Sequence, residues 1–181
     1  MHTQRFSNLE FYFCHLIKYT SLTILLLYKI INTNLIEACI PFPEIKIINL
    51  GSSCIYPLDA ANPISENSFM DGKLEPTNSP YAMAKLSAIE IGRSISAQHG
   101  HKITNLMPTN LYGQNDNFHS QNSHVIPAMM RRFHDAKLAD TAKVVVWGSG
   151  KPMREFLHVD DLAVACLHVM NLPRAKFLAE A

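Results

Sequence analysis

Short runs of β-branched residues alternate with longer helical stretches along most of this chain, and this alternation constrains the fold more than any other feature. The runs are rich in Ile, Val and Thr, as buried strands are. Strands are expected at residues 45–50, 102–107 and 143–147. Helices are expected at residues 79–99, 123–136 and about 160–170. Strands that alternate with helices predict an α/β protein with a mostly parallel sheet.

Local residue types predict where these helices begin and end. Ser79 is expected to cap the first helix, with Pro80 at the first helical position. Gly100 is expected to end this helix in the left-handed conformation. Either Asp160 or Asp161 is expected to cap the last helix.

An apolar run of ten residues (YTSLTILLLY) occupies positions 19–28. A bilayer span needs about 20 apolar residues, and no small-residue cleavage site follows the run. A membrane anchor or signal segment is therefore the less favoured interpretation. The favoured one is a buried helix that ends before Pro41 and Pro43. Residues recur at helical spacing at positions 27, 30, 31, 34, 35 and 38.

Composition indicates a folded domain and narrows the classes of partner. The chain has 181 residues, of which 48% are hydrophobic, so it can bury a core. A formal net charge of +1 argues against a nucleic-acid binder. The cysteines form no C-x-x-C pair, which argues against a zinc site or a disulfide framework and favours the reducing cytoplasm. They are Cys14, Cys39, Cys54 and Cys166.

Chemically useful side chains follow the first expected strand. Residues 51–54 (GSSC) lie at its carboxyl end, where parallel α/β sheets bind ligands. Tyr81 and Lys85 are four residues apart, so they share one face of a helix. An ammonium beside a phenol is expected to lower the phenol's pKa and to prepare it for acid/base chemistry. Taken singly, these features also suit an ordinary turn and an ordinary helix surface.

Ser52 and the YAMAK segment at 81–85 resemble the Ser and Tyr-x-x-x-Lys set of the extended short-chain dehydrogenase/reductases, which bind nicotinamide dinucleotides. Six blocks in order, within a match from about Ile30 to Met170, resemble the GDP-L-fucose synthases of the NAD-dependent epimerase/dehydratase family. The blocks are 50–57 (LGSSCIYP), 74–78 (LEPTN), 107–113 (MPTNLYG), 116–119 (DNFH), 122–127 (NSHVIP) and 145–161 (VVWGSGKPMREFLHVDD).

The resemblance implies a partial Rossmann-like, doubly wound parallel sheet with part of a smaller substrate-binding lobe. Residues 1–29 would then be a divergent N-terminal segment, and 30–181 a partial NAD(P)-dependent epimerase/dehydratase domain. Within it, the Rossmann part would cover about 30–113, with elements of the substrate lobe interleaved at about 114–181. Intact members of the family are expected to form homodimers.

The resemblance also implies a reaction in two stages on GDP-4-keto-6-deoxy-mannose. Epimerisation at C3 and C5 is followed by reduction of the C4 ketone by NADPH, which gives GDP-L-fucose. Because C3 and C5 flank the ketone, their protons are acidic, and inversion needs a base on one face and an acid on the other. By resemblance, Cys54 and His124 are that pair. Without the resemblance, Cys54 would be a small buried hydrophobe and His124 a surface residue beside a helix start.

The remaining roles also follow from the resemblance. Tyr81 would protonate the C4 oxygen, Lys85 would tune Tyr81 and hold the nicotinamide ribose, and Ser52 would hydrogen-bond the ketone. The residues implied for cofactor binding are Leu50, Gly51, Ser52, Ser53, Lys85, Pro108, Thr109, Asn110, Leu111 and His124. The residues implied for substrate binding are Arg132, Trp147 and Arg154, which offer guanidinium groups to a diphosphate and an indole to a flat ring. No metal site is implied.

Glycine is placed differently from the family pattern. All seven glycines lie at or beyond Gly51, whereas an intact member opens with a strand and G-x-x-G-x-x-G that holds the dinucleotide pyrophosphate. The chain also stops at Ala181, where the family continues. A truncated or mis-joined gene product and a degenerate paralogue are both compatible with this pattern. The alternative functions are a non-catalytic relic without the phosphate loop and another sugar-nucleotide epimerase or dehydratase.

Overall fold

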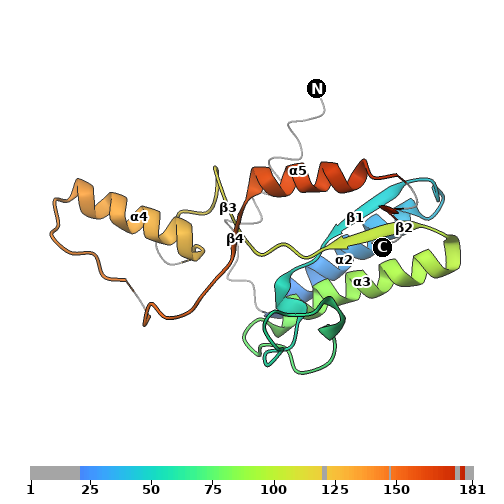
Figure 1. The fold of residues 1–181 in the computed structure, drawn as a ribbon, viewed down its shortest axis with the longest axis horizontal. Helices are drawn as coiled ribbons and strands as arrows, with labels where there is room; N and C mark the ends of the chain where they lie inside the picture. The colour runs from blue at the N-terminus through green and yellow to red at the C-terminus, as the bar shows by residue number, and fades with distance from the viewer. Residues whose placement is uncertain (1–20, 120–121, 147, 174–175, 178–181) are drawn as a thin grey trace. The chain divides into compact units, whose positions relative to one another are not determined.

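A computed structural model describes residues 21–119, 122–146, 148–173 and 176–177 of the chain. It divides into two compact units (Figure 1). The N-terminal unit combines Tyr19–Thr109 with Leu162–Ala181, and the middle unit contains Asn110–Asp161. Each unit is described by itself below.

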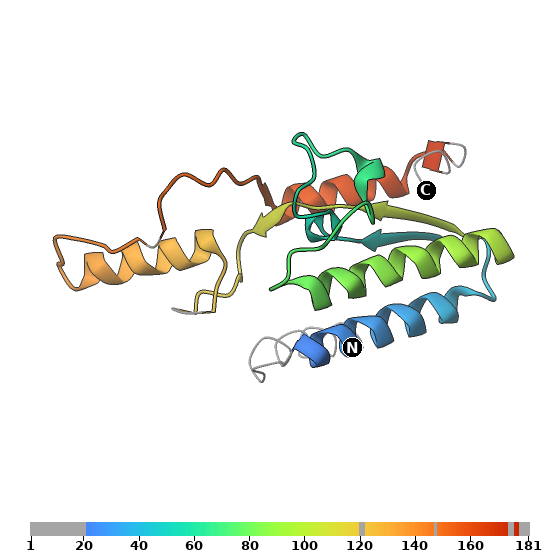
Figure 2. The same ribbon diagram turned by 90° about the horizontal axis from the view of Figure 1, so that it is seen from below.

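The N-terminal unit is built around two parallel strands joined by a helix. Lys46 of β1 lies opposite Lys102 of β2, and the register continues to Leu50 opposite Leu106. Figure 2 shows these strands with α3 on one side and the later part of α5 on the other. The elements are α2 (Ser21–Cys39), β1 (Lys46–Leu50), η1 (Ser53–Ile55), η2 (Glu66–Ser68), α3 (Ser79–His99), β2 (Lys102–Leu106) and, from Leu162 onward, α5 (Val159–Met170). This β1–α3–β2 crossover confirms the α/β class predicted from the sequence.

Helix α3 lies between α2 and the sheet, and small residues make this close packing possible (Figure 2). Ala84 and Ala88 are fully buried, and a Cβ added at Gly92 would lie 3.3 Å from the side chain of Ile103. One core cluster joins α2, α3 and β2 through Ile36, Ile95 and Ile103. A second cluster, Ile55, Leu86 and Ile89, fixes η1 against α3. The strand end and the start of α3 are therefore held together.

The helix at α2 is confirmed, but the prediction of its buried face is wrong. Leu35 is 61% exposed and Ile30 is 54% exposed, whereas Ile36 is buried. The helix is apolar on more than one side, so residue spacing alone does not select the side that meets α3. Residues Leu22–Cys39 also satisfy the length and hydropathy expected of a membrane span, as do some signal sequences and core helices.

Two of the predicted helix caps are displaced by one or two residues. Asn78, not Ser79, is the N-cap of α3, and Pro80 lies in the first turn. Helix α5 begins at Val159, so Asp160 and Asp161 lie inside its first turn and cap nothing. Carboxylates at this position still interact favourably with the helix dipole. The stop at Gly100 is confirmed, with a φ of 71°.

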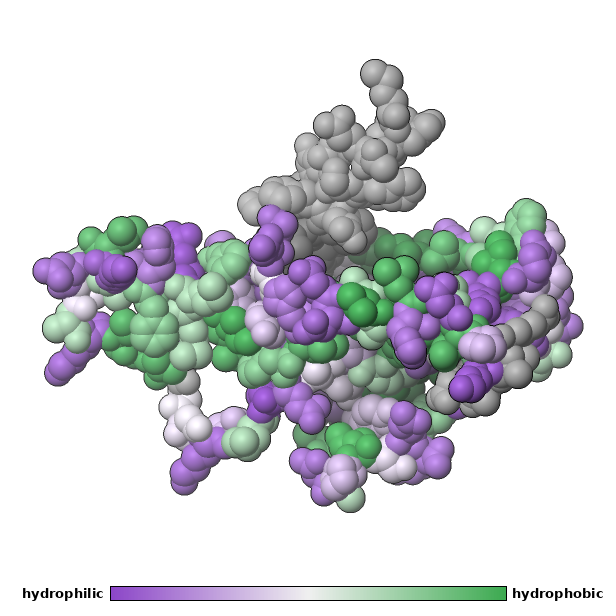
Figure 3. Space-filling model, turned by 45° about the horizontal axis from the view of Figure 1, so that its top comes forward, coloured by the Kyte–Doolittle hydropathy of each residue, from purple (hydrophilic) through white to green (hydrophobic). Residues whose placement is uncertain are grey.

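The middle unit pairs two short parallel strands, β3 (Asn110–Tyr112) and β4 (Phe156–His158), joined through α4 (Val125–Leu138). The strand predicted at 143–147 is wrong. Residues 143–146 have no regular structure, and Val145 is 74% exposed because no strand pairs with this segment. Trp147 lies outside the described residues. Helix α4 exposes the apolar side chains of Met130, Phe133 and Leu138. The space-filling view in Figure 3 shows hydrophobic and hydrophilic residues side by side on the surface of the described chain.

Candidate active site

Glycine at position 51 lets the end of β1 approach the end of β2. The Gly51 N–H donates to the Leu106 carbonyl at 2.8 Å, which extends the pairing one residue beyond β1. A Cβ at Gly51 would collide with Sδ of Met107. The chain then turns into η1, so the side chains of the next residues lie at the carboxyl end of the sheet.

Ser52 and Cys54 form a local hydrogen-bonded turn at this strand end. Ser52 is the N-cap of η1, and its hydroxyl oxygen accepts from the Cys54 N–H at 3.4 Å. The Cys54 thiol donates to the same oxygen at 3.1 Å. This turn holds the thiol beside the hydroxyl rather than in a separate apolar pocket.

The first turns of α3 bring Tyr81 and Lys85 to the same place. The Lys85 ammonium donates to the Leu50 carbonyl at 2.7 Å and lies over the Tyr81 ring, 5.6 Å from its centroid. The Ser52 side chain is also near enough to the Tyr81 phenol to lower its pKa. The structure thus gathers Ser52, Cys54, Tyr81 and Lys85, four residues singled out from the sequence, at the carboxyl end of β1.

The environment of Tyr81 corrects one expectation. Burial, together with Tyr28 and Cys54, raises the pKa of Tyr81 to about 12, and the Ser52 side chain opposes this shift. The predicted lowering by Lys85 is wrong, because removal of the phenol from water outweighs it. Burial also lowers the pKa of Lys85, against the effect of Cys54. Tyr81 therefore carries its proton at neutral pH and is suited to donate it.

A pH dependence of stability follows from this raised pKa. The folded chain favours the neutral form of the Tyr81 phenol. The stabilisation that results is fully present below pH 10, because 10.0 is the ordinary pKa of a tyrosine side chain. The contribution is lost as the pH rises through about 12. Urea unfolding should be measured from about pH 9 to about pH 11.5, because the ordinary and the raised pKa of the phenol are 10.0 and about 12. Over this range the wild type should lose stability faster than Tyr81→Phe. Parallel curves for the two proteins would contradict the assignment.

A cavity of about 250 Å³ in the middle unit gathers four more of the predicted residues: Asn110, Leu111, His124 and Arg154. His124 is the N-cap of α4, and its side chain makes no capping hydrogen bond. Asn110 donates to the Glu155 carbonyl at 3.0 Å, and the Arg154 guanidinium donates to the Met153 carbonyl at 2.9 Å. The other lining residues are Ser123, Val125, Ile126, Pro127 and Phe156.

Other predicted residues lie elsewhere. Arg132 is half-buried on α4 and does not line this cavity. Pro108 and Thr109 follow β2 in the N-terminal unit. Cys54 belongs to the N-terminal unit and His124 to the middle unit, so their pairing stays a prediction. Within the described ranges, no three His, Cys, Asp or Glu residues are arranged to hold a metal ion.

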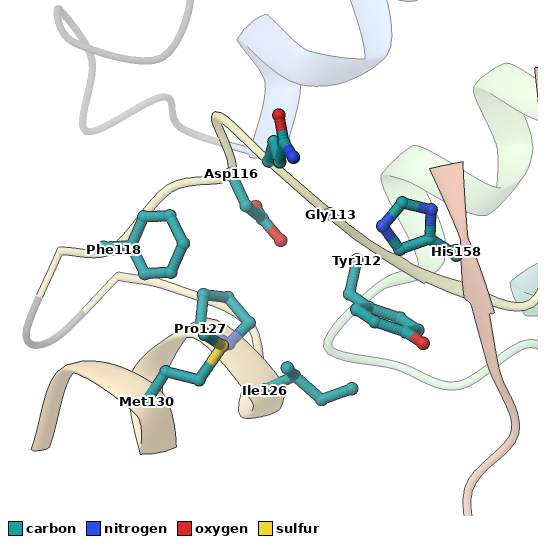
Figure 4. Close-up of a pocket in the computed structure, with 9 residues that line it drawn as sticks. Tyr112, Gly113, Asp116, Phe118, Ile126, Pro127, Met130 and His158 are labelled. Carbon is teal, nitrogen blue, oxygen red and sulfur yellow. The ribbon is translucent and has the colours of Figure 1, made fainter. Parts of the chain in front are cut away.

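A second cavity, of about 320 Å³, was not anticipated from the sequence. Figure 4 shows Phe118, Pro127 and Met130 on one side of it and Tyr112 and His158 on the other. The Tyr112 and His158 rings meet edge to face, 5.2 Å between centroids. These residues lie within or beside the blocks that carried the family resemblance, but neither spacing nor chemistry assigned them a site.

The β1–α3–β2 crossover, with its polar groups beyond the strand ends, is the arrangement of α/β proteins that bind ligands at the carboxyl ends of their parallel strands. Residues 28–179 match the NAD dependent epimerase/dehydratase family. The chain belongs to this family.

Comparison with individual proteins supports membership of this family. The chain is 53% identical to GDP-L-fucose synthase of Escherichia coli K12 over 148 residues, which are 82% of this chain and 46% of that protein. It is 55% identical over 141 residues to putative GDP-L-fucose synthase 2 of Arabidopsis thaliana, covering 78% of this chain and 43% of that protein. The chain thus spans less than half the length of these relatives.

Among solved structures, a GDP-L-fucose synthetase from Naegleria fowleri bound to NADP superposes with a TM-score of 0.78 at 33% identity. The match covers 86% of this chain and 51% of that one. The Rossmann-like fold class implied by the sequence resemblance is therefore confirmed.

Proposed function

We propose that this chain carries the catalytic region of a GDP-L-fucose synthase. The proposed reaction is 3,5-epimerisation of GDP-4-keto-6-deoxy-mannose followed by NADPH-dependent reduction at C4. The observation that carries the proposal is the convergence of Ser52, Cys54, Tyr81 and Lys85 at the carboxyl end of β1. Identities of 53% and 55% to proteins named GDP-L-fucose synthase support the choice of reaction.

The epimerisation stage uses a base and an acid on opposite faces of the sugar. Cys54 and His124 take these roles in the proposal. Only a thiolate is an effective base, so Cys54 must lose its proton before it removes one from the sugar. His124 suits a proton donor or acceptor because a neutral imidazole has one N–H donor and one acceptor nitrogen.

The reduction stage depends on a proton donor at the C4 oxygen. Tyr81 supplies this proton, since a pKa of about 12 keeps the phenol protonated at neutral pH. Ser52, which lies beside Tyr81, would hydrogen-bond the ketone and orient it. Lys85 stands beside Tyr81 as a fixed cation that stabilises developing negative charge.

The residues present fit the nicotinamide end of NADPH, which supplies the hydride when bound. Lys85 at the Leu50 carbonyl places a donor and an acceptor side by side at the strand end, as ribose hydroxyls require. In the proposal this end of the cofactor is held by Leu50, Gly51, Ser52, Ser53, Lys85, Pro108, Thr109, Asn110, Leu111 and His124.

The GDP-sugar is proposed to bind through the 250 Å³ cavity of the middle unit. His124 and Arg154 line this cavity, and a guanidinium suits a diphosphate. Arg132 and Trp147 are proposed as further substrate contacts. No nucleic-acid partner is proposed, because the net charge is only +1.

We also propose a cytoplasmic homodimer rather than a membrane protein. Helix α2 packs against α3, yet it leaves Leu22, Ile30 and Leu35 exposed. A second copy would cover such an apolar surface. The proposed division keeps 1–29 as a separate segment, with a Rossmann part at about 30–113 and elements of the substrate lobe at about 114–181.

Exchange of substrate protons with solvent tests the epimerase stage without cofactor. When the chain is incubated with GDP-4-keto-6-deoxy-mannose in D₂O, the sugar should incorporate deuterium at C3 and C5, and NMR measures this incorporation. Cys54→Ser should lower this incorporation by about 100-fold to about 10,000-fold, because a serine hydroxyl is a far weaker base. Where NADPH turnover is measurable, the variant should reduce the unepimerised ketone.

Cys166→Ser is the matched control, since Cys166 is also a partly buried free thiol and lies on α5. Its exchange should equal that of wild type. Unchanged exchange in Cys54→Ser would remove Cys54 from the mechanism. No exchange in any of the proteins would favour a non-catalytic relic. Another sugar-nucleotide activity is not favoured, because identity falls to 36% for a GDP-L-colitose synthase.

A further inference from the structure

Helix α2 brings a second phenol against Tyr81 and Lys85. The rings of Tyr28 and Tyr81 meet edge to face, with centroids 5.2 Å apart and planes at 81°. The Lys85 Nζ lies over the Tyr28 ring as well, 5.2 Å from its centroid. Sequence analysis placed Tyr28 at the end of an apolar run and gave it no role.

Three groups lie near the Lys85 ammonium: the two rings and the Leu50 carbonyl. Ring faces attract a cation within about 6 Å of the centroid, and both Tyr28 and Tyr81 lie inside this distance. The Leu50 carbonyl accepts its hydrogen bond. A single hydrogen bond leaves a long lysine side chain free to change rotamer, whereas two aromatic faces restrict it. Tyr28 is the only one of these partners that comes from α2.

We propose that Tyr28 is a positioning residue for the Tyr81–Lys85 pair: its ring packs edge to face on Tyr81 from the α2 side and, together with the Tyr81 ring, keeps the Lys85 ammonium at the Leu50 carbonyl. The proposal rests on the proposed function only in treating Tyr81 and Lys85 as catalytic. The geometry of the three side chains is independent of which substrate is used.

The charges around Tyr81 agree with this role. The titratable groups that face Tyr81 are Tyr28 on α2, Cys54 on η1 and Lys85 on α3. After burial, Tyr28 is the largest cause that raises the pKa of Tyr81, because two neighbouring phenolates repel each other. Tyr28 thus helps to keep Tyr81 in the protonated form that donates.

The first experiment measures the position of Lys85 by NMR. A lysine between two rings has its Hε resonance shifted upfield by ring currents. We expect Tyr28→Phe to keep this shift, because the ring remains. Tyr28→Leu should remove the share of the upfield shift that the Tyr28 ring causes, so the Lys85 Hε resonance should move downfield. Lys29→Ala, an exposed neighbour on α2, is the control and should change nothing. An unchanged Lys85 resonance in Tyr28→Leu overturns the proposal.

The second experiment follows the Tyr81 phenol in chain labelled with ¹³C at Cζ of tyrosine, assigned through Tyr81→Phe. Tyr28→Phe keeps the burial of Tyr81 but removes the second ionisable phenol, so Tyr81 should begin to ionise at lower pH than in wild type. Lys29→Ala should match wild type. Identical Tyr81 titrations in wild type and Tyr28→Phe would show that the two phenols are not in contact, which overturns the proposal even if Tyr28→Leu does not fold.

Neither readout depends on turnover, so this proposal and the proposed function fail separately. A chain that shows both NMR effects but no deuterium exchange contradicts the function and supports the positioning role. A chain that exchanges substrate protons but shows neither effect supports the function and overturns the role of Tyr28.

Discussion

Replacing Tyr81 with Phe is expected to lower the rate of C4 reduction by about 100-fold to about 10,000-fold, the usual range for loss of a general acid. Proton exchange at C3 and C5 should continue, because the proton from Tyr81 is needed only when the C4 oxygen becomes an alkoxide. Deuterium incorporation and NADPH oxidation measure the two stages separately. Both should be followed in a chimera in which residues 28–179 replace the matching region of the E. coli synthase.

The control for this variant is Tyr56→Phe. Tyr56 is a partly buried phenol that packs against the cluster of Ile55, Leu86 and Ile89, so its loss tests for general disturbance of the region. Both rates should stay close to those of the parent chimera. An equal fall of the two rates in Tyr81→Phe would show that Tyr81 also stabilises the enolate, and its role would need to be reassigned.

The 181-residue chain by itself is expected to bind NADPH weakly. A dinucleotide pyrophosphate lies over a Gly-rich turn because any Cβ there blocks the approach of the backbone, and residues 1–50 contain no glycine. Each missing hydrogen bond to a charged phosphate costs about 1.5–3 kcal/mol. Since about 1.4 kcal/mol is a tenfold change in Kd, losing several such bonds weakens binding by orders of magnitude.

Calorimetric titration with NADPH measures this directly. The chimera, which regains the Gly-rich turn from the E. coli protein, is the matched control and should bind tightly. A micromolar Kd for the 181-residue chain would contradict the prediction and would require a phosphate site outside the family pattern. Weak binding by both proteins would instead show that the strand-end residues hold the nicotinamide poorly.

Much of the N-terminal unit was predictable because its signals are local. A short run rich in isoleucine predicted β1. Gly100 predicted the end of α3, because a helix that ends in the left-handed conformation needs a residue that tolerates a positive φ. The approach of Tyr81 and Lys85 followed from helical spacing. Their approach to Ser52 was expected from the family resemblance, and the β1–α3–β2 crossover brings the two segments together.

Predictions from local sequence failed where the structure of a segment depends on another segment that pairs with it or packs against it. The segment at 143–146 has the residues of a strand, but a strand exists only when another pairs with it. The apolar residues of α2 leave several packing faces possible, and contact with α3 selected the one that contains Ile36. The 320 Å³ cavity beside Tyr112 and His158 likewise depends on β3, β4 and α4 coming together.

The sequence by itself determined the family, the α/β class, and the identity of the residues gathered at the end of β1. Only the tertiary structure decided that the Tyr81 phenol is buried and that the Tyr28 ring lies against it. Residue spacing along α3 places an ammonium near a phenol, but it does not predict that the phenol is buried. Burial raises the pKa of Tyr81 to about 12. Tyr28 lies 53 residues before Tyr81, and the packing of α2 on α3 alone brings the two rings within 5.2 Å.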